Sequence, residues 1–245
     1  RPPRPSPPGA LMGVLDRAAC PVEADSRAFT DAALAELRAG GWSPAGWARF
    51  VAGVAVRSGE QVVAHPRPAA ELSLLHGVFL VAARRRGRWW ITMSWLMAIT
   101  HLGLLGRRRS IGWPNAISLT RANLAVTGEP LGRWLGVVAA ASDKLDGTLA
   151  RRQGPTMFGF YADSLADAAF WTWLGARRDP SRLVLAASVA AWAAPVAAMV
   201  AASITKGELV ESPRPALPRP AAAMQVVLAV RHLRTRCPAR AGPTR

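Results

Sequence analysis

The sequence has few cysteines and few acidic residues for its length. Its two cysteines, Cys20 and Cys237, lie near opposite ends of the chain and have no neighbouring ligand motif. This arrangement predicts neither a disulfide nor a metal site made by cysteine, and it favours a reducing compartment. No short apolar segment followed by a cleavage site lies near the start, so a secretory signal peptide is not expected.

The shortage of acidic residues leaves the chain strongly basic. It has 15 Asp and Glu residues against 31 Lys and Arg residues, a formal net charge of +16, and yet 51% of its residues are hydrophobic. These values conflict in a soluble globule and agree in a membrane protein with basic loops. A basic protein can also bind nucleic acid. Here the arginines form short clusters between apolar runs, which favours anionic lipid head groups and an anionic nucleotide substrate over nucleic acid.

Apolar runs and proline-rich stretches divide the chain into four regions. We expect a disordered Pro/Arg-rich stretch at 1–24, short soluble or interfacial helices at 25–68, a transmembrane catalytic bundle at 69–206, and a Pro-rich linker, short apolar helix and basic tail at 207–245. The predicted fold is all-α, a polytopic transmembrane bundle of about six helices with an N-terminal extension of short amphipathic helices. The clearest single span is Leu183 to Ile204, which is uncharged.

Basic clusters predict the orientation of the bundle. Trp89 to Gly106 reads as one continuous span, and Arg107–Arg109 follows it. If residues 113–150 form an out-and-back hairpin, this cluster and Arg151-Arg152 both lie in the cytoplasm, where basic loops concentrate. We therefore expect the functional site, which is built around the end of this hairpin, to face the cytoplasm.

Four aspartates interrupt this otherwise apolar part of the chain. Asp143 and Asp146 are three residues apart, and Asp163 and Asp167 are four apart. Residues at these spacings share one face of a helix, so two helices joined by a turn at Gln153–Pro155 would bring four carboxylates together. Ionised carboxylates repel one another and are costly near hydrocarbon. Divalent cations such as Mg²⁺ or Mn²⁺ prefer oxygen ligands and would relieve both problems.

The order of these residues resembles the signature of the CDP-alcohol phosphatidyltransferases, with one residue fewer than usual in the turn. Its fixed positions are Asp143, Asp146, Gly147, Ala150, Arg151, Gly159, Asp163 and Asp167. Upstream, Asn115, Ser118 and Arg121 resemble the Asn-x-x-Thr-x-x-Arg pattern often seen on the first core helix of that family, with serine in place of threonine.

The resemblance implies an integral membrane enzyme of phospholipid biosynthesis. Such an enzyme transfers a phosphatidyl group from CDP-diacylglycerol, or a related CDP-alcohol, to the hydroxyl of an alcohol acceptor and releases CMP. The resemblance also implies a homodimer among membrane lipids and a pair of Mg²⁺ or Mn²⁺ ions. Asp143, Asp146 and Asp163 would bind these ions together with Asp167, which would also be the catalytic base.

The remaining signature residues have implied roles at the nucleotide. Gly147, Ala150 and Gly159 have little or no side chain and would let the nucleotide approach the backbone. Arg151 would meet a phosphate oxygen, although a membrane-edge arginine paired with an aspartate is equally consistent with the sequence. The upstream triplet offers candidate substrate contacts, and polar groups that pack helices together explain it equally well.

Two other functions compete with this interpretation. In a non-catalytic membrane scaffold the aspartates would be structural ion pairs, but only Arg151 and Arg152 are close to them in sequence. A metal-dependent membrane prenyltransferase would need a second Asp-rich motif far along the chain. Beyond the signature region, the C-terminal third has almost no acidic residues apart from Glu208 and Glu211. The family resemblance therefore gives the favoured function.

Overall fold

The computed structural model describes residues 21–179, 181–210 and 218–234, and within these ranges the regular structure is entirely helical. The predicted all-α class is therefore confirmed for the described chain. The expected disorder before Pro21, most of the proline-rich linker, the basic tail beyond Arg234 and both cysteines lie outside the described residues.

The described helices are separated by short connections. They are α2 (Pro21–Ala39), α3 (Pro44–Ala64), α4 (Pro66–Ala82), η1 (Arg85–Gly87), α5 (Arg88–Ile99), η2 (Leu102–Leu105), α6 (Gly112–Thr127), η3 (Glu129–Trp134), α7 (Leu135–Gln153), α8 (Met157–Arg178), α9 (Arg182–Lys206) and α10 (Pro218–Arg234).

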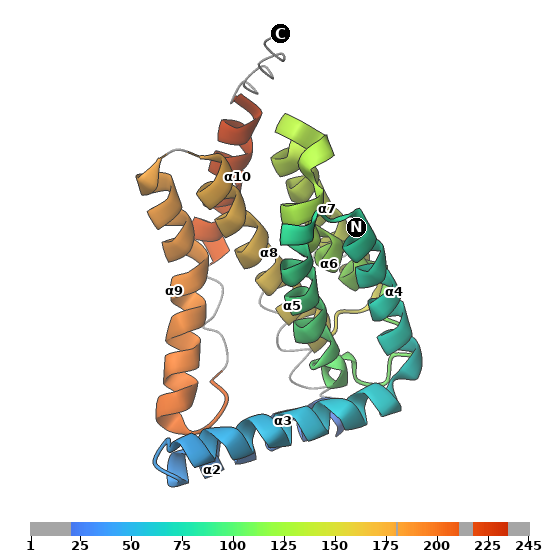
Figure 1. Ribbon diagram of the computed structural model, residues 1–245, viewed down its shortest axis with the longest axis vertical. Coiled ribbons are helices and arrows are strands. Elements are labelled where there is room, and N and C mark those ends of the chain that lie inside the picture. The colour runs from blue at the N-terminus through green and yellow to red at the C-terminus, as the bar shows by residue number, and fades with distance from the viewer. Residues whose placement is uncertain (1–20, 180, 211–217, 235–245) are drawn as a thin grey trace, which may run out of the picture.

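Helices α4 to α10 run side by side, and α2 and α3 lie across one end of them (Figure 1). Local sequence fixes several helix ends. The side chain of Thr156 accepts a hydrogen bond from Gly159 N at the start of α8, and that of Ser181 accepts one from Val184 N at the start of α9. Such caps satisfy backbone donors that the first turn leaves free. Gly154, with φ of 87°, ends α7 in a conformation that glycine adopts readily.

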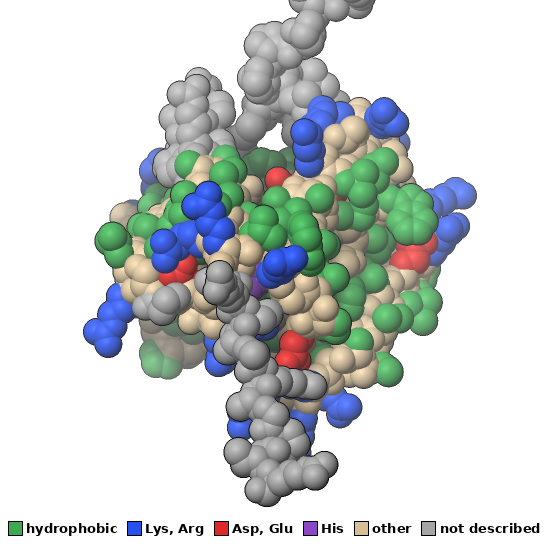
Figure 2. Space-filling model, turned by 90° about the horizontal axis from the view of Figure 1, so that it is seen from above, with side chains coloured by type: hydrophobic (Ala, Val, Ile, Leu, Met, Phe, Trp, Pro, Cys, Tyr) green, Lys and Arg blue, Asp and Glu red, His purple; other side chains and the backbone are tan. Residues whose placement is uncertain are grey.

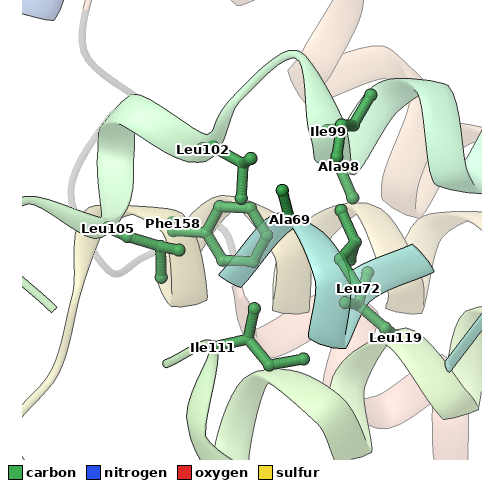
Figure 3. Packing of buried hydrophobic residues seen from close by; sticks show 9 residues of the cluster. All are labelled: Ala69, Leu72, Ala98, Ile99, Leu102, Leu105, Ile111, Leu119 and Phe158. Carbon is green, nitrogen blue, oxygen red and sulfur yellow. The ribbon is translucent and has the colours of Figure 1, made fainter. Parts of the chain in front are cut away.

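Two apolar clusters hold the bundle together. The first surrounds Phe158 and joins α4, α5, η2, α6 and α8 (Figure 3). The second joins α6 to α10 and contains Phe170 and Trp171 of α8, with Trp171 stacked on Trp192 of α9. Along α8, Phe158 belongs to one cluster and Phe170 to the other, so the stretch between them carries polar residues at the junction of the two clusters.

The outer surface of the bundle exposes large apolar side chains. Leu74 and Val81 of α4 are 72% and 86% exposed, and Leu183 of α9 is 79% exposed. Seen from the end opposite α3, hydrophobic side chains appear at the surface between groups of Lys and Arg (Figure 2). Among the described helices, α9 alone is long and apolar enough to cross a membrane by length and composition. A bundle of about six spanning helices therefore stays a prediction.

The element boundaries differ from expectation in three places. Helix α2 begins at Pro21, inside the stretch expected to be disordered. The segment predicted as one span from Trp89 to Gly106 is divided, because α5 ends at Ile99 and η2 follows. The C-terminal helix, α10, was expected outside the bundle but packs against α7, α8 and α9.

Candidate active site

Three neighbouring helices build a polar cluster inside the bundle. Helix α7 contributes Asp143 and Asp146, and α8 contributes Asp163 and Asp167. Helix α6 packs against both and contributes Arg121, whose side chain is 0% exposed. The predicted convergence of the four carboxylates is present, and a buried guanidinium lies among them.

Arg121 forms ion pairs with all four aspartates. Its Nη2 lies 3.5 Å from Asp143 Oδ1 and also pairs with Asp163 Oδ1. Its Nη1 donates a hydrogen bond to Asp146 Oδ2 at 2.9 Å. Its Nε lies 2.8 Å from Asp167 Oδ1, although neither of these two atoms forms a well-directed hydrogen bond. The sequence-based argument that the aspartates lack a nearby basic partner was therefore wrong, because the partner comes from a separate helix.

The cluster keeps an excess of negative charge and an open side. One guanidinium against four carboxylates leaves a formal charge of −3 when all are ionised. The side chains of Asp143 and Asp163 are 33% and 44% exposed, whereas those of Asp146 and Asp167 are 4% and 15% exposed. A ligand can therefore reach the cluster from the side of Asp143 and Asp163.

Three of the aspartates fit a divalent cation. Single carboxylate oxygens of Asp143, Asp163 and Asp167 lie within 4.8 Å of one another. Two oxygen ligands of one Mg²⁺ ion are at most about 4.2 Å apart, so shifts of about 1 Å would be enough. All the donors are hard oxygens, which suit Mg²⁺ or Mn²⁺. Asp146 lies outside this group, and Ser118 and Arg121 both donate hydrogen bonds to its Oδ2.

The upstream triplet lies on the face of α6 that meets the aspartates. Asn115, Ser118 and Arg121 are all buried. Ser118 Oγ donates to Asp146 Oδ2 at 2.7 Å, and Asn115 Nδ2 donates to Ile111 O at 2.7 Å. Two of the three residues thus contact the carboxylates. Their spacing of three residues along one helix is the signal that predicts a shared face.

The small residues of the signature differ in their surroundings. A Cβ added to Gly159 would lie 2.6 Å from Asn115 Oδ1, so this glycine allows α6 and α8 to approach closely. At Gly147 the nearest neighbour of an added Cβ would be Arg151 Nη1 at 3.4 Å, which leaves this position more open. Arg151 is exposed and donates to Thr148 Oγ1 at 3.0 Å, and Ala150 is half-buried. The nucleotide-binding roles of these residues stay predictions.

Two residues near the site lie outside the predicted set. Gln225 of α10 donates from Nε2 to Asp167 Oδ2 at 2.5 Å. Arg108 donates from Nη2 to Gln153 O and Gly154 O, both at 2.8 Å, and so fixes the shortened turn between α7 and α8. The cluster at 107–109 pointed to Arg108 only as a basic loop residue, and nothing in the sequence linked Gln225 to Asp167.

A carboxylate on α4 fixes the start of α6. Ser110 Oγ and Ile111 N donate to Glu71 Oε2 at 2.7 and 2.9 Å. Arg67 Nε donates to the other oxygen, Glu71 Oε1, at 2.9 Å. The carboxylate therefore anchors the start of the helix that carries Arg121.

Comparison with known protein families finds a match for the part of the chain that contains this site. Residues 111–230 match the family model of the CDP-alcohol phosphatidyltransferases, a range that begins just before α6 and includes all four aspartates and Gln225. No curated protein and no solved structure matches the chain. Proteins of this family are transferases that act on CDP-alcohols and use divalent metal ions. The chain therefore contains a CDP-alcohol phosphatidyltransferase domain, which extends from residue 111 to residue 230.

Proposed function

We propose that this protein is an integral membrane enzyme that transfers a phosphatidyl group from CDP-diacylglycerol, or a related CDP-alcohol, to an alcohol hydroxyl and releases CMP. The observation that carries the proposal is the convergence of four signature aspartates on one partly open cluster. Their excess negative charge calls for cations, and the cations that suit carboxylate oxygens also bind the phosphates of such a substrate.

Asp143, Asp146, Asp163 and Asp167 would hold a pair of Mg²⁺ or Mn²⁺ ions. The three carboxylates within 4.8 Å of one another support this assignment. Asp146 would join them by turning away from its present partners, Ser118 and Arg121. The bound ions would supply charge neutralisation at the phosphoryl oxygens, where negative charge gathers in the transition state.

Asp167 is the candidate base. The acceptor oxygen forms a bond to the phosphorus nearer the lipid, the bond from that phosphorus to CMP breaks, and the hydroxyl proton passes to the carboxylate of Asp167. Gln225 holds Oδ2 of this carboxylate by a hydrogen bond. Because Asp167 is less exposed than Asp143 and Asp163, it would meet a substrate that has already entered past them.

The nucleotide would lie along the turn between α7 and α8. The open backbone at Gly147 supports this placement, as does the exposed guanidinium of Arg151. Gly159 supports it indirectly, by keeping α6 close to α8. Ser118 would position Asp146 from α6. The triplet of Asn115, Ser118 and Arg121 would supply the substrate contacts from this helix.

The same proposal places the bundle in a membrane, with its site toward the cytoplasm. The apolar helix α9 and the exposed apolar side chains of α4 support membrane embedding. Arg108 contacts the turn between α7 and α8, and Arg151-Arg152 lie in the last turn of α7. Basic loops favour the cytoplasmic side. The family resemblance adds the expectation of a homodimer.

The test is release of CMP from labelled CDP-diacylglycerol by membranes containing the protein. Acceptors should include glycerol phosphate, inositol phosphate and serine, and the product lipid identifies the right one. We expect activity with Mg²⁺ or Mn²⁺, loss with EDTA, and a fall of about a hundredfold or more in Asp167→Asn, because removing a general base typically costs that much. Asp179→Asn, outside the cluster, is the control.

Two results would contradict the proposal. One is the absence of metal-dependent CMP release with every acceptor and with other CDP-alcohols. The other is an Asp167→Asn enzyme as active as the wild type. Either would return the protein to the scaffold interpretation, in which the aspartates and Arg121 form a structural ion cluster.

A further inference from the structure

Arg121 lies among the four carboxylates that would bind the proposed metal ions. Its side chain is completely buried and forms ion pairs with all four aspartates. In the part of the chain that the structure describes, no other cationic side chain forms an ion pair with these carboxylates. Three of its partners, Asp143, Asp163 and Asp167, are also the three whose oxygens could hold one metal ion. Arg121 and a metal ion therefore need the same ligands.

The geometry of the cluster differs from that of a guanidinium paired with a single carboxylate. A guanidinium pairs best with one carboxylate through two parallel hydrogen bonds. Here one guanidinium is shared among four carboxylates, and the contact between Nε and Asp167 Oδ1 is close but poorly aligned. When all four carboxylates are ionised, a single positive charge also leaves three negative charges unbalanced. Buried charges left in this state favour the entry of further cations.

We propose that Arg121 is an internal counter-cation, which gathers the four carboxylates in the metal-free protein and gives up part of them when divalent ions bind. When metal binds, divalent ions then replace the guanidinium of Arg121 as the partner of some of the carboxylates, at a site that is already formed. This inference rests on the metal use in the proposed function and deepens it. Arg121 is a positioning residue in this account, because its guanidinium acts through the carboxylates.

The exchange predicts opposite effects of Arg121 on the two states. Without metal, its positive charge offsets the repulsion among the carboxylates, so its removal destabilises the fold. With metal, it stands close to another cation and competes for the same oxygens, so its removal strengthens metal binding. At these distances even a well-screened unit charge changes the affinity for a divalent ion by about tenfold or more.

The experiment compares the full chain and its Arg121→Met variant in detergent micelles. Thermal unfolding is measured in EDTA and at increasing Mn²⁺, and Mn²⁺ binding is measured separately by the electron paramagnetic resonance of the free ion. We expect Arg121→Met to have a lower Tm in EDTA, a larger rise in Tm with Mn²⁺, and a Kd for Mn²⁺ at least about tenfold lower. Arg121→Lys, which keeps the charge, should stay close to the wild type.

Arg231→Met is the matched control, because Arg231 pairs with Asp179 away from the cluster. It should lower Tm equally with and without Mn²⁺ and leave the Kd unchanged. If Arg121→Met shows the same Mn²⁺ response and the same Kd as the wild type, the counter-cation role is wrong. If the wild type itself does not bind Mn²⁺, the metal use in the proposed function fails as well, so the two failures are distinguishable.

A variant that does not fold in EDTA is also informative. In that case Mn²⁺, or the additional change Asp163→Asn, should restore folding, because either reduces the unbalanced negative charge. Recovery by one of these supports the exchange. If neither restores Arg121→Met, the side chain is needed for packing and the inference is overturned.

Discussion

At Gly159 the side chain of Asn115 leaves no room for a Cβ atom. An added Cβ would lie 2.6 Å from Asn115 Oδ1 and 3.1 Å from Thr156 Oγ1. Gly159→Ala therefore has to push α8 away from α6 or displace a buried amide. We expect a loss of stability of about 1–3 kcal/mol, as is usual for overpacking, visible as a lower Tm in detergent.

Gly147 provides the matched control, because an added Cβ would meet only Arg151 Nη1, at 3.4 Å. Gly147→Ala should not lower Tm, because alanine is about 1 kcal/mol more favourable than glycine inside a helix. It should raise KM for the CDP-alcohol, if the nucleotide approaches the backbone there. Equal losses of stability in the two variants would contradict the packing difference. An unchanged KM in Gly147→Ala would remove this glycine from the nucleotide site.

Gln225 is the residue of α10 that touches the candidate base. Replacing it with leucine removes the hydrogen bond to Asp167 Oδ2 while keeping a side chain of similar size. A hydrogen bond to a charged group contributes about 1.5–3 kcal/mol, so we expect kcat for CMP release to fall about tenfold or more with little change in KM. Met224→Leu, the neighbouring position on α10, should retain full kcat. A higher KM with an unchanged kcat would instead place Gln225 at the substrate.

The residues of the site were predictable to different degrees for physical reasons. Spacing along two helices brings the aspartates together, and spacing is visible in a sequence. The sequence does not distinguish a substrate contact from a packing group at Arg121, because its partners lie on helices that are 22 or more residues away in the chain. Gln225 lies 58 residues beyond Asp167, and no periodicity spans such a distance.

At the scale of the element, α10 is held in place by an ion pair with the end of α8. Arg231 Nε donates to Asp179 Oδ2 at 2.5 Å, and its Nη2 donates to Oδ1 at 3.0 Å. Hydrogen bonding from Arg231 is the main cause that holds the pKa of Asp179 below its usual value, and the backbone of Ser181 adds to it. This pair joins the C-terminal part of α10 to the end of α8.

The lowered pKa of Asp179 sets the sign of a pH effect. Because the folded pKa lies below the unfolded one, the stabilisation is complete above about pH 4 and is lost as the pH falls through the folded pKa. Between about pH 5 and pH 3, the wild type should therefore lose more of its Tm than Asp179→Asn, which has no carboxylate there. Parallel curves of Tm against pH for the two proteins would show that the pair does not stabilise the fold.

The division between α5 and η2 shows why one predicted element failed. The apolar run from Trp89 to Gly106 has the composition of a single span. In the structure a Cβ at Gly103 would lie 2.8 Å from Ser26 Oγ and 3.0 Å from Gln61 Oε1. Helices α2 and α3 therefore pack directly on the glycine, just after the end of α5. Contacts of this kind come from distant segments, so local hydropathy does not reveal them.

At the scale of the whole molecule, the N-terminal helices tie the bundle together. Arg38 Nη1 donates to Lys206 O at 2.6 Å, and Leu209 N donates to Asp31 Oδ1 at 2.6 Å. These bonds join α2 to the end of α9, while α3 continues directly into α4. The sequence predicted short helices here but gave no partner for them. That α2 and α3 connect α9 with α4 is visible only in the fold.

The position of the molecule in a membrane can be tested on α9. Its 25 residues make a helix about 37 Å long, enough to cross a hydrocarbon core of about 30 Å. Ala194 lies at its midpoint and is exposed, whereas Leu183 is exposed beside Arg182 at its start. Arginine at the centre of a span costs about 2.5–3.5 kcal/mol, and far less at an end. Ala194→Arg should therefore reduce the fraction of protein that stays in the membrane pellet after alkaline carbonate extraction, and Leu183→Arg should not. If both variants and the wild type are extracted into the soluble fraction, α9 does not span the bilayer and its apolar surface must be covered by protein.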